Sequence, residues 1–201
     1  MFQRLMQMES EIQKAKEALR SQIREVLKKI APEKRKVDSQ NLSAELKVQP
    51  FIQSSTSILF FAPLPDELDL WPALEEVLAE GKIVALPCFD AENQRYLPRR
   101  VTDLRVELVS GRFGIREPEP ACMEVPLADL DAILVPGVAF DVRGYRLGRG
   151  KGFYDRLLAD FTGRKIGIAF DEQLVGAVPT GKDDVRMNFI LTPSRCVNCD
   201  G

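Results

Sequence analysis

The stretch AILVPGVAFDVRGYRLGRGKGFYDRLLADFTGRKIGIA, residues 132–169, decides the fold. It opens with an apolar run at 132–135, passes through a glycine-rich loop, and reaches a segment at about 153–161 whose apolar residues recur at helical spacing. A second apolar run follows at 165–169. A strand, a helix and another strand in this order predict a βαβ unit with parallel strands.

The same order occurs earlier in the chain. Residues 57–62 (SILFFA) predict a buried strand, residues 69–81 a helix, and residues 83–86 (IVAL) the next strand. Two such units predict an α/β fold: a single-domain open sheet with βαβ units flanked by helices in Rossmann-like layers. Between the units we expect short strands within 95–109 and a proline-punctuated loop at 111–126.

The N-terminal segment, about residues 5–30, predicts an amphipathic helix that packs on this domain and ends at Pro32. Lys16 and Arg20 fall at the edge of its apolar stripe. Two interpretations stay open. Their aliphatic stems cover apolar surface, or their charged ends flank whatever the helix packs against.

The composition is that of one globular domain spanning residues 1–201, with 45% hydrophobic and 29% charged residues. The 28 Lys and Arg nearly cancel the 30 Asp and Glu, so the net charge of -2 provides no overall field for a polyanion. We therefore expect no nucleic-acid partner, and any anion site must be local. No apolar run is long enough for a membrane span, and the N-terminus does not have the pattern of a signal peptide.

The chain contains no histidine, which excludes Ser-His-Asp and Cys-His catalysis and imidazole acid/base chemistry. Its 4 cysteines do not form the framework of a small secreted domain, so we expect a cytoplasmic protein. Cys196 and Cys199 have a spacing that suits half a zinc site or a redox pair. The remaining thiols, Cys88 and Cys122, lie in distant segments.

The loop before the second helix has the features of a phosphate site. Gly148, Gly150 and Gly152 alternate with Arg149 and Lys151, which leaves backbone N–H groups uncovered beside two cations. The pattern is neither a Walker A motif nor GxGxxG. In the alternative interpretation, the glycines only form a tight turn and the cations are solvated.

Two aspartates are candidate magnesium ligands. Asp155 falls in the first helical turn, where it either interacts with the helix dipole or holds a metal beside the phosphates. Asp184 lies in the loop before the apolar run at 189–191, where an aspartate often only forms a turn.

The motifs PGVAFD (136–141) and RLGRGKGFYD (146–155) make the chain resemble the 5-formyltetrahydrofolate cyclo-ligase family, also called methenyltetrahydrofolate synthetases. Weaker matches occur in the family's order along most of the chain: KEALR at 16–20, DE at 66–67, GKIVALP at 81–87, REP at 116–118 and VPTGKDD at 178–184. The resemblance implies ATP-dependent closure of 5-formyltetrahydrofolate to 5,10-methenyltetrahydrofolate, with release of ADP and phosphate and with Mg²⁺ as cofactor. We expect small-molecule substrates only, and a monomer.

The resemblance also assigns site residues. It implies that ATP binds to Lys16, Glu17, Ala18, Leu19 and Arg20 and to Arg146, Leu147, Gly148, Arg149, Gly150, Lys151, Gly152, Phe153 and Tyr154. It implies that the folate substrate binds to Ala62, Glu67, Arg149, Gly150, Lys151, Gly152 and Phe153, and that Asp155 and Asp184 hold magnesium.

The implied chemistry suits a chain without histidine. The formyl oxygen attacks the γ-phosphoryl group of ATP, the other folate nitrogen closes on the activated carbon, and phosphate leaves. Such a transfer needs positioning and charge neutralisation more than a strong base. We expect Lys151 and Arg149 to stabilise the transferred phosphoryl group.

The chain departs from the family at Cys88, where a basic residue is common, and at Asn188, where Asp is common. Two other functions stay open: an ATP-dependent enzyme that activates a different formamide or amide, and a non-catalytic RNA-binding module that uses the basic loop. Salt-dependent affinity for RNA would identify the second.

Overall fold

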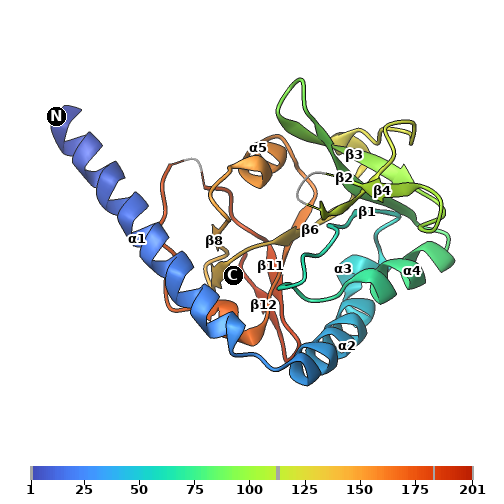
Figure 1. The fold of residues 1–201 in the computed structure, drawn as a ribbon, viewed down its shortest axis with the longest axis horizontal. Coiled ribbons are helices and arrows are strands. Elements are labelled where there is room, and N and C mark those ends of the chain that lie inside the picture. Colours follow the sequence, from blue (N-terminus) through green and yellow to red (C-terminus); the bar gives the residue numbers. More distant parts are fainter. Residues whose placement is uncertain (1, 112–113, 183, 201) are drawn as a thin grey trace.

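The structure is a computed structural model that describes residues 2–111, 114–182 and 184–200 (Figure 1). Within these ranges the main sheet has seven strands in the order β12-β11-β9-β6-β1-β2-β3. Their bounds are β1 Ser57–Leu59, β2 Ile83–Asp90, β3 Arg95–Val101, β6 Ala132–Pro136, β9 Arg164–Ile168, β11 Phe189–Leu191 and β12 Cys196–Asn198. The predicted α/β fold with an open sheet is confirmed.

The five inner strands are parallel, and β3 and β12 pair antiparallel at the two edges. From β1 the chain moves to β2 on one side, and then through β6, β9 and β11 on the other side. This is the flavodoxin-like order of doubly wound sheets, whose switch point lies between the first and third parallel strands. Here it lies between β1 and β6, so ligands are expected beyond the carboxyl ends of these two strands.

Helices cover both faces of the sheet. In β6, Ala132 and Leu134 belong to the core under α2 (Pro32–Val48), α3 (Pro50–Gln53) and α4 (Trp71–Ala79). Ile133 and Val135 belong to the core under α5 (Phe153–Ala159). A parallel strand that is buried on both sides reads as a continuous apolar run, which explains why these strands do not alternate in sequence.

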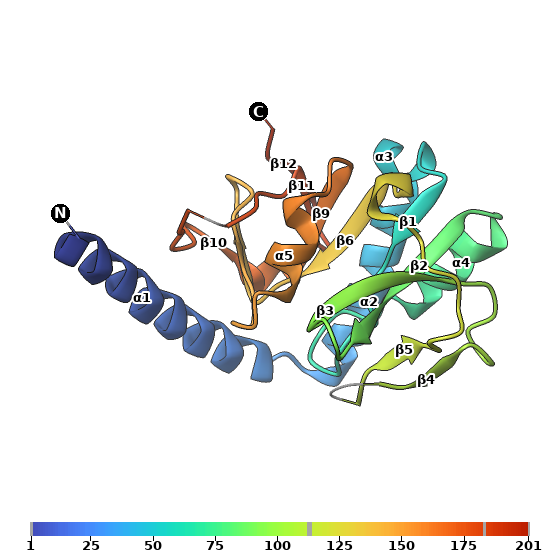
Figure 2. The ribbon, with the colours of Figure 1, turned by 90° about the horizontal axis from the view of Figure 1, so that it is seen from above.

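The N-terminal helix differs from the expectation. Helix α1 spans Phe2–Lys28. Pro32 is the first residue of a second helix, α2, and the first position of a helix is one that proline favours. The second half of α1 meets the domain, since Ile23 and Leu27 are buried, whereas Met6 and Met8 in the first half are exposed. Figure 2 shows the first half extending away from the body.

The segment between the two βαβ units is more ordered than expected. Residues 111–126 are not only a loop, because β5 (Arg116–Pro118) pairs antiparallel with β4 (Leu108–Ser110). The prolines hid this strand, because they predict a loop and do not indicate pairing with β4. Helix α5 is shorter than predicted and ends at Ala159.

A small sheet lies beside the main one, in the order β10-β7-β8, with β7 Ala139–Asp141, β8 Arg146–Leu147 and β10 Leu174–Val175. It holds the start of the glycine-rich loop. Across the described part of the chain, no helix combines the length and apolar character needed to cross a membrane.

Candidate active site

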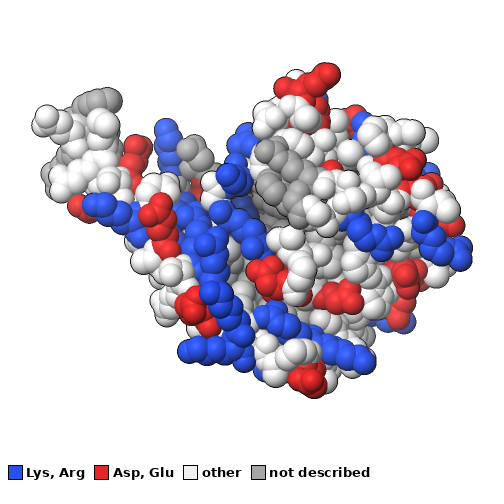
Figure 3. All heavy atoms as spheres, viewed as in Figure 1, with Lys and Arg blue, Asp and Glu red and all other residues white. Residues whose placement is uncertain are grey.

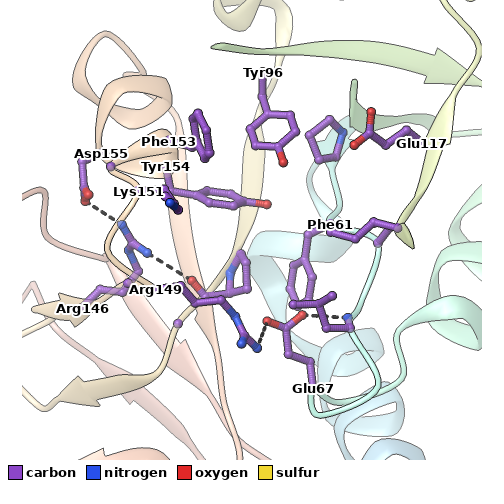
Figure 4. Close-up of a pocket in the computed structure, with 18 residues that line it drawn as sticks. Phe61, Glu67, Tyr96, Glu117, Arg146, Arg149, Lys151, Phe153, Tyr154 and Asp155 are labelled. Atoms are coloured by element: carbon purple, nitrogen blue, oxygen red, sulfur yellow. Dashed lines mark hydrogen bonds and ion pairs between the residues drawn. The ribbon is translucent and has the colours of Figure 1, made fainter. Parts of the chain in front are cut away.

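A cavity of about 350 Å³ opens at the switch point of the sheet. Phe61 and Ala62 follow β1, Pro136 ends β6 and Gly137 follows it, and all four line the cavity. The glycine-rich loop between β8 and α5 forms another wall, as Figure 4 shows. The chain therefore places its phosphate-type loop where the topology of the sheet leaves a crevice.

Two glycines of this loop adopt a conformation that other residues rarely take. Gly150 has φ 99° and Gly152, the residue before α5, has φ 65°. Both values lie in the left-handed region that favours glycine. At Gly137, which follows β6 beside Arg146, a Cβ atom would lie 2.6 Å from the Phe140 ring. The alternation of glycines thus follows from the backbone path of the loop.

Arg146 is the buried cation of the loop, with a side chain only 4% exposed. Its guanidinium donates to Asp155 Oδ1 at 2.5 Å and to the Pro136 carbonyl at 3.3 Å. Its Nε has no hydrogen-bond partner among the residues that the structure describes. A buried donor without a partner is costly, so a ligand acceptor at this point would stabilise it.

Arg149 bridges the loop to the segment after β1. Its Nη2 donates to Asp66 Oδ1 at 2.9 Å and to Glu67 Oε1 at 3.0 Å. The other Glu67 oxygen accepts from the Leu64 N–H. Burial raises the pKa of Glu67 above its usual range, and these two donors oppose that shift only in part.

Lys151 lines the same cavity but differs from both arginines. Arg146 and Arg149 each pair with carboxylates, whereas no carboxylate within the described ranges lies at ion-pair distance from Lys151. Its ammonium group is therefore available to an anionic ligand.

Helix α1 brings two further cations to the loop. Arg20 donates to the Gly148 carbonyl at 2.9 Å, and its guanidinium carbon would lie 3.6 Å from a Cβ on Gly150. Lys16 is buried and pairs with Asp184 at 2.7 Å, although 168 positions separate them in sequence. Figure 3 shows Lys and Arg side chains gathered in the hollow between α1 and the body. The charged ends of Lys16 and Arg20 thus face the domain.

Other predicted site residues lie outside the cavity. Glu17 and Ala18 are exposed on α1, and Leu19 packs against the main core. Leu147 is buried in β8 behind the loop. By contrast, the cavity is lined by other residues that were predicted to bind ATP or folate: Ala62, Glu67, Gly148, Gly152, Phe153 and Tyr154.

The two predicted magnesium ligands each have a cationic partner. Asp155 pairs with Arg146, and Asp184 pairs with Lys16 while also accepting from the Gly181 N–H at 2.6 Å. Over the described ranges, no three carboxylate or thiol side chains gather into a site that could bind a metal by themselves. A magnesium ion here would depend on phosphate oxygens and water for most of its ligands.

The wall opposite the loop contains residues that sequence analysis missed as site residues. Pro87 comes from β2, Tyr96 from β3 and Glu117 from β5, and all three line the cavity. The rings of Phe89, Tyr96 and Phe153 meet edge to face, with centroids 5.2–5.5 Å apart. The only signal for Glu117 was the short REP motif, because the strand that holds it was read as loop.

A second hollow of about 380 Å³ adjoins the first. The two share Leu64, Glu67 and Ile115 as lining residues. Trp71 and Arg116 line the far part, with the Arg116 guanidinium 4.8 Å from the centre of the Trp71 ring. The site can therefore extend along the segment after β1.

The chain departs from the family's usual residues at two positions, one on a strand that lines the cavity and one remote from the cavity. Cys88 is buried in β2. Asn188 lies away from the cavity, where its side chain accepts from the Lys165 N–H and donates to Asp200. An aspartate could not donate to Asp200, so the amide suits this partner.

The C-terminal cysteines do not resemble a reactive pair. Cys196 is exposed on β12, and Cys199 is buried just after it. Burial raises the pKa of Cys199 to about 11, which keeps the thiol protonated near neutral pH.

Comparison with known proteins identifies relatives of this chain. A family model described as the 5-formyltetrahydrofolate cyclo-ligase family matches residues 12–193. A 5-formyltetrahydrofolate cyclo-ligase of Escherichia coli (strain K12) is 34% identical over 180 residues, which cover 86% of this chain and 97% of the relative. A protein of that name from Mus musculus is 27% identical over 191 residues, covering 90% and 94%.

Solved structures agree with the sequence relatives. The NMR structure of Aquifex aeolicus 5,10-methenyltetrahydrofolate synthetase superposes with a TM-score of 0.83 at 34% identity, covering 92% of this chain and 93% of that one. A 5,10-methenyltetrahydrofolate synthetase from Mycoplasma pneumoniae has a TM-score of 0.71 at 21% identity, over 89% of this chain and 98% of that one, and supports the fold.

Proposed function

This chain belongs to the 5-formyltetrahydrofolate cyclo-ligase family, and on that premise we propose how its cavity carries out the family's reaction. The reaction is the ATP-dependent closure of 5-formyltetrahydrofolate to 5,10-methenyltetrahydrofolate, as predicted from the sequence. The observation that carries the mechanism is the arrangement of three loop cations around one cavity, of which Lys151 has no carboxylate partner among the described residues.

The first step is activation of the formyl oxygen. A formamide oxygen is a poor leaving group, so it attacks the γ-phosphoryl group of ATP and becomes a phosphate ester, while the bond from the γ-phosphorus to ADP breaks and ADP leaves. Lys151 lies against the transferred group, where its charge offsets the negative charge that develops on the phosphoryl oxygens. Arg149 orients the folate substrate, because it already links the loop to Glu67.

The second step is ring closure. The other folate nitrogen attacks the activated formyl carbon, the C–O bond to phosphate breaks, and the proton of that nitrogen leaves with the phosphate. Closure requires that nitrogen and carbon be held close together, which an apolar cavity with ring-stacking walls favours. Ala62, Phe153 and Tyr154 supply such walls beside the loop.

The triphosphate of ATP enters from the side of α1. Lys16 and Arg20 lie at this side of the loop, and the backbone N–H groups at 148–152 complete the anion site. Phosphate oxygens compete with Asp184 for the Lys16 ammonium group, so ATP binding frees the Asp184 carboxylate.

A magnesium ion fits Asp155 better than Asp184 in the arrangement described. The Asp155 side chain is 32% exposed and has one oxygen on Arg146, whereas both Asp184 oxygens contact Lys16. When bound, magnesium would neutralise phosphate charge. Asp155 would hold it from α5, and Asp184 would join once Lys16 turns to the phosphates. We also propose a monomer, since one chain supplies all of these groups, and a cytoplasmic location, which its 4 free cysteines support.

A spectrophotometric assay tests the proposal. Purified protein is mixed with 5-formyltetrahydrofolate, and the absorbance of the methenyl product is followed. We expect product only when ATP and Mg²⁺ are both present, with one ADP formed for each product. Product without ATP, or ATP hydrolysis without product, would contradict the proposed mechanism.

A further inference from the structure

Glu117 lines the cavity, and one oxygen of its carboxylate is buried without a hydrogen-bond partner among the described residues. The residue is 6% exposed and lies on β5, in the wall opposite the glycine-rich loop. Its Oε2 accepts from the Phe89 N–H at 3.0 Å. Its Oε1 is buried and has no hydrogen-bond partner among the residues that the structure describes. An unpaired buried carboxylate oxygen is costly, so its presence calls for a donor that the described residues do not supply.

The position of this carboxylate is fixed by its surroundings. The Phe89 N–H holds one oxygen, and the backbone of Gly111 lies directly against the side chain. A Cβ on Gly111 would lie 2.7 Å from Oε2. A glycine is therefore needed here for close approach and not for a positive φ. The Glu117 side chain is packed in place before any ligand arrives.

The missing partner is not one of the cations of the cavity. Arg146 and Arg149 pair with other carboxylates, and within the described ranges no Lys or Arg lies at ion-pair distance from Glu117. Figure 4 shows Glu117 on the side of Tyr96 and Phe61, away from Arg146 and Asp155. The cations and this carboxylate thus line different parts of one cavity.

The chemistry of the oxygen selects the kind of ligand. An ionised carboxylate only accepts hydrogen bonds, and it repels phosphate. The ligand group must therefore be an N–H or O–H donor on a part of the substrate distant from the triphosphate. The pyrimidine ring of 5-formyltetrahydrofolate carries a 2-amino group and an adjacent ring N–H, and both are donors.

We propose that Glu117 is a specificity-determining residue that accepts a hydrogen bond from the 2-amino pyrimidine edge of the folate substrate. This inference rests on the proposed function, because it takes the folate ring as the ligand of the cavity. The hydrogen bond to a charged acceptor orients the ring so that the formyl group faces the glycine-rich loop. Lys151 and Glu117 then hold opposite ends of one reacting complex.

The first test is Glu117→Gln, with Glu119→Gln as a matched control two residues along and outside the cavity lining. Phe89 N–H can still bond to the amide oxygen, which leaves an NH₂ group facing the ligand. We expect KM for 5-formyltetrahydrofolate to rise about tenfold or more, while KM for ATP changes less than twofold. Unchanged folate KM, or an equal rise for ATP, would overturn the proposal.

The second test uses the wild-type protein, so it does not depend on the folding of a variant. The substrate is a 5-formyltetrahydrofolate analogue whose 2-amino group is replaced by hydrogen. Wild type should bind it about tenfold more weakly than the natural substrate by calorimetry, and Glu117→Gln should not distinguish the two. Equal wild-type affinity for both ligands would refute the role of Glu117. Failure of wild type to turn over the natural substrate would instead refute the proposed function.

Discussion

The two walls of the cavity are built in opposite ways. The loop wall comes from one contiguous stretch, residues 146–155, and carries the cations Arg146, Arg149 and Lys151. The facing wall comes from segments on β2, β3 and β5, and carries Pro87, Tyr96 and Glu117. The loop wall suits phosphate, because successive backbone N–H groups must converge on one anion. The facing wall suits a flat ring, which needs shape and a few acceptors that can come from anywhere in the chain.

The largest expected effect is on the loop wall. Lys151→Ala should lower kcat at least ~100-fold with a small change in KM, because a cation aimed at the transferred phosphoryl group acts mainly in the transition state. Steady-state kinetics measure this, with circular dichroism to check folding. Lys36→Ala, an exposed lysine on α2, serves as the control. Wild-type turnover in Lys151→Ala would mean that its ammonium group is only solvated.

The second effect concerns Arg149, which links the loop wall to the segment after β1. Arg149→Lys should lower kcat/KM for 5-formyltetrahydrofolate about tenfold, because Nη2 alone contacts both Asp66 and Glu67, and a lysine ammonium group ends one atom short of that position. The comparison variant is Arg156→Lys on α5, which makes no carboxylate contact that the structure describes. Equal kinetics for the two variants would show that the bridge does not orient the substrate.

The third effect tests the magnesium ligands. Asp155→Asn should raise the Mg²⁺ concentration for half-maximal rate about three- to tenfold, and Asp184→Asn should do likewise. The double variant should lose less than the two single losses combined, because either change already disrupts a shared ion. Magnesium titrations of the initial rate measure all three, with Asp160→Asn as control at the end of α5. Additive losses, or an unchanged titration in either single variant, would argue against a shared site.

Behind the loop wall, the expected effect is on stability and not on activity. Asp141 is fully buried and holds the turn between β7 and β8. Burial alone would raise its pKa, but Arg143 and several backbone N–H groups lower it below the ordinary value. A lowered folded-state pKa stabilises the fold above about pH 4, and this contribution is lost as pH falls through the folded pKa.

Asp141→Asn should therefore lower the free energy of unfolding by about 1–3 kcal/mol at pH 7. The difference from wild type should shrink at pH 3. Urea unfolding at the two pH values measures it, and Asp129→Asn, on an exposed turn, controls for the charge change. A difference that is constant with pH would show that the Asp141 charge does not carry the effect.

The sequence by itself predicted the parts of this protein that depend on neighbours along the chain. Apolar runs marked β6, β9 and β11 within a residue or two, because strands buried on both faces must be apolar throughout. The glycine-rich loop could also be recognised from the sequence, because its cations and glycines act through backbone groups that are adjacent in the chain. The family and its reaction followed from that one stretch.

Only the tertiary structure decided what depends on distant segments. Sequence spacing could not show that β5 pairs with β4, that Pro32 begins a helix, or that the parallel strands take the flavodoxin-like order. It also could not place Lys16 against Asp184, or show that one buried Glu117 oxygen has no partner among the described residues. These contacts join residues far apart in the chain, and their energies come from burial and pairing that exist only once the sheet has brought those segments together.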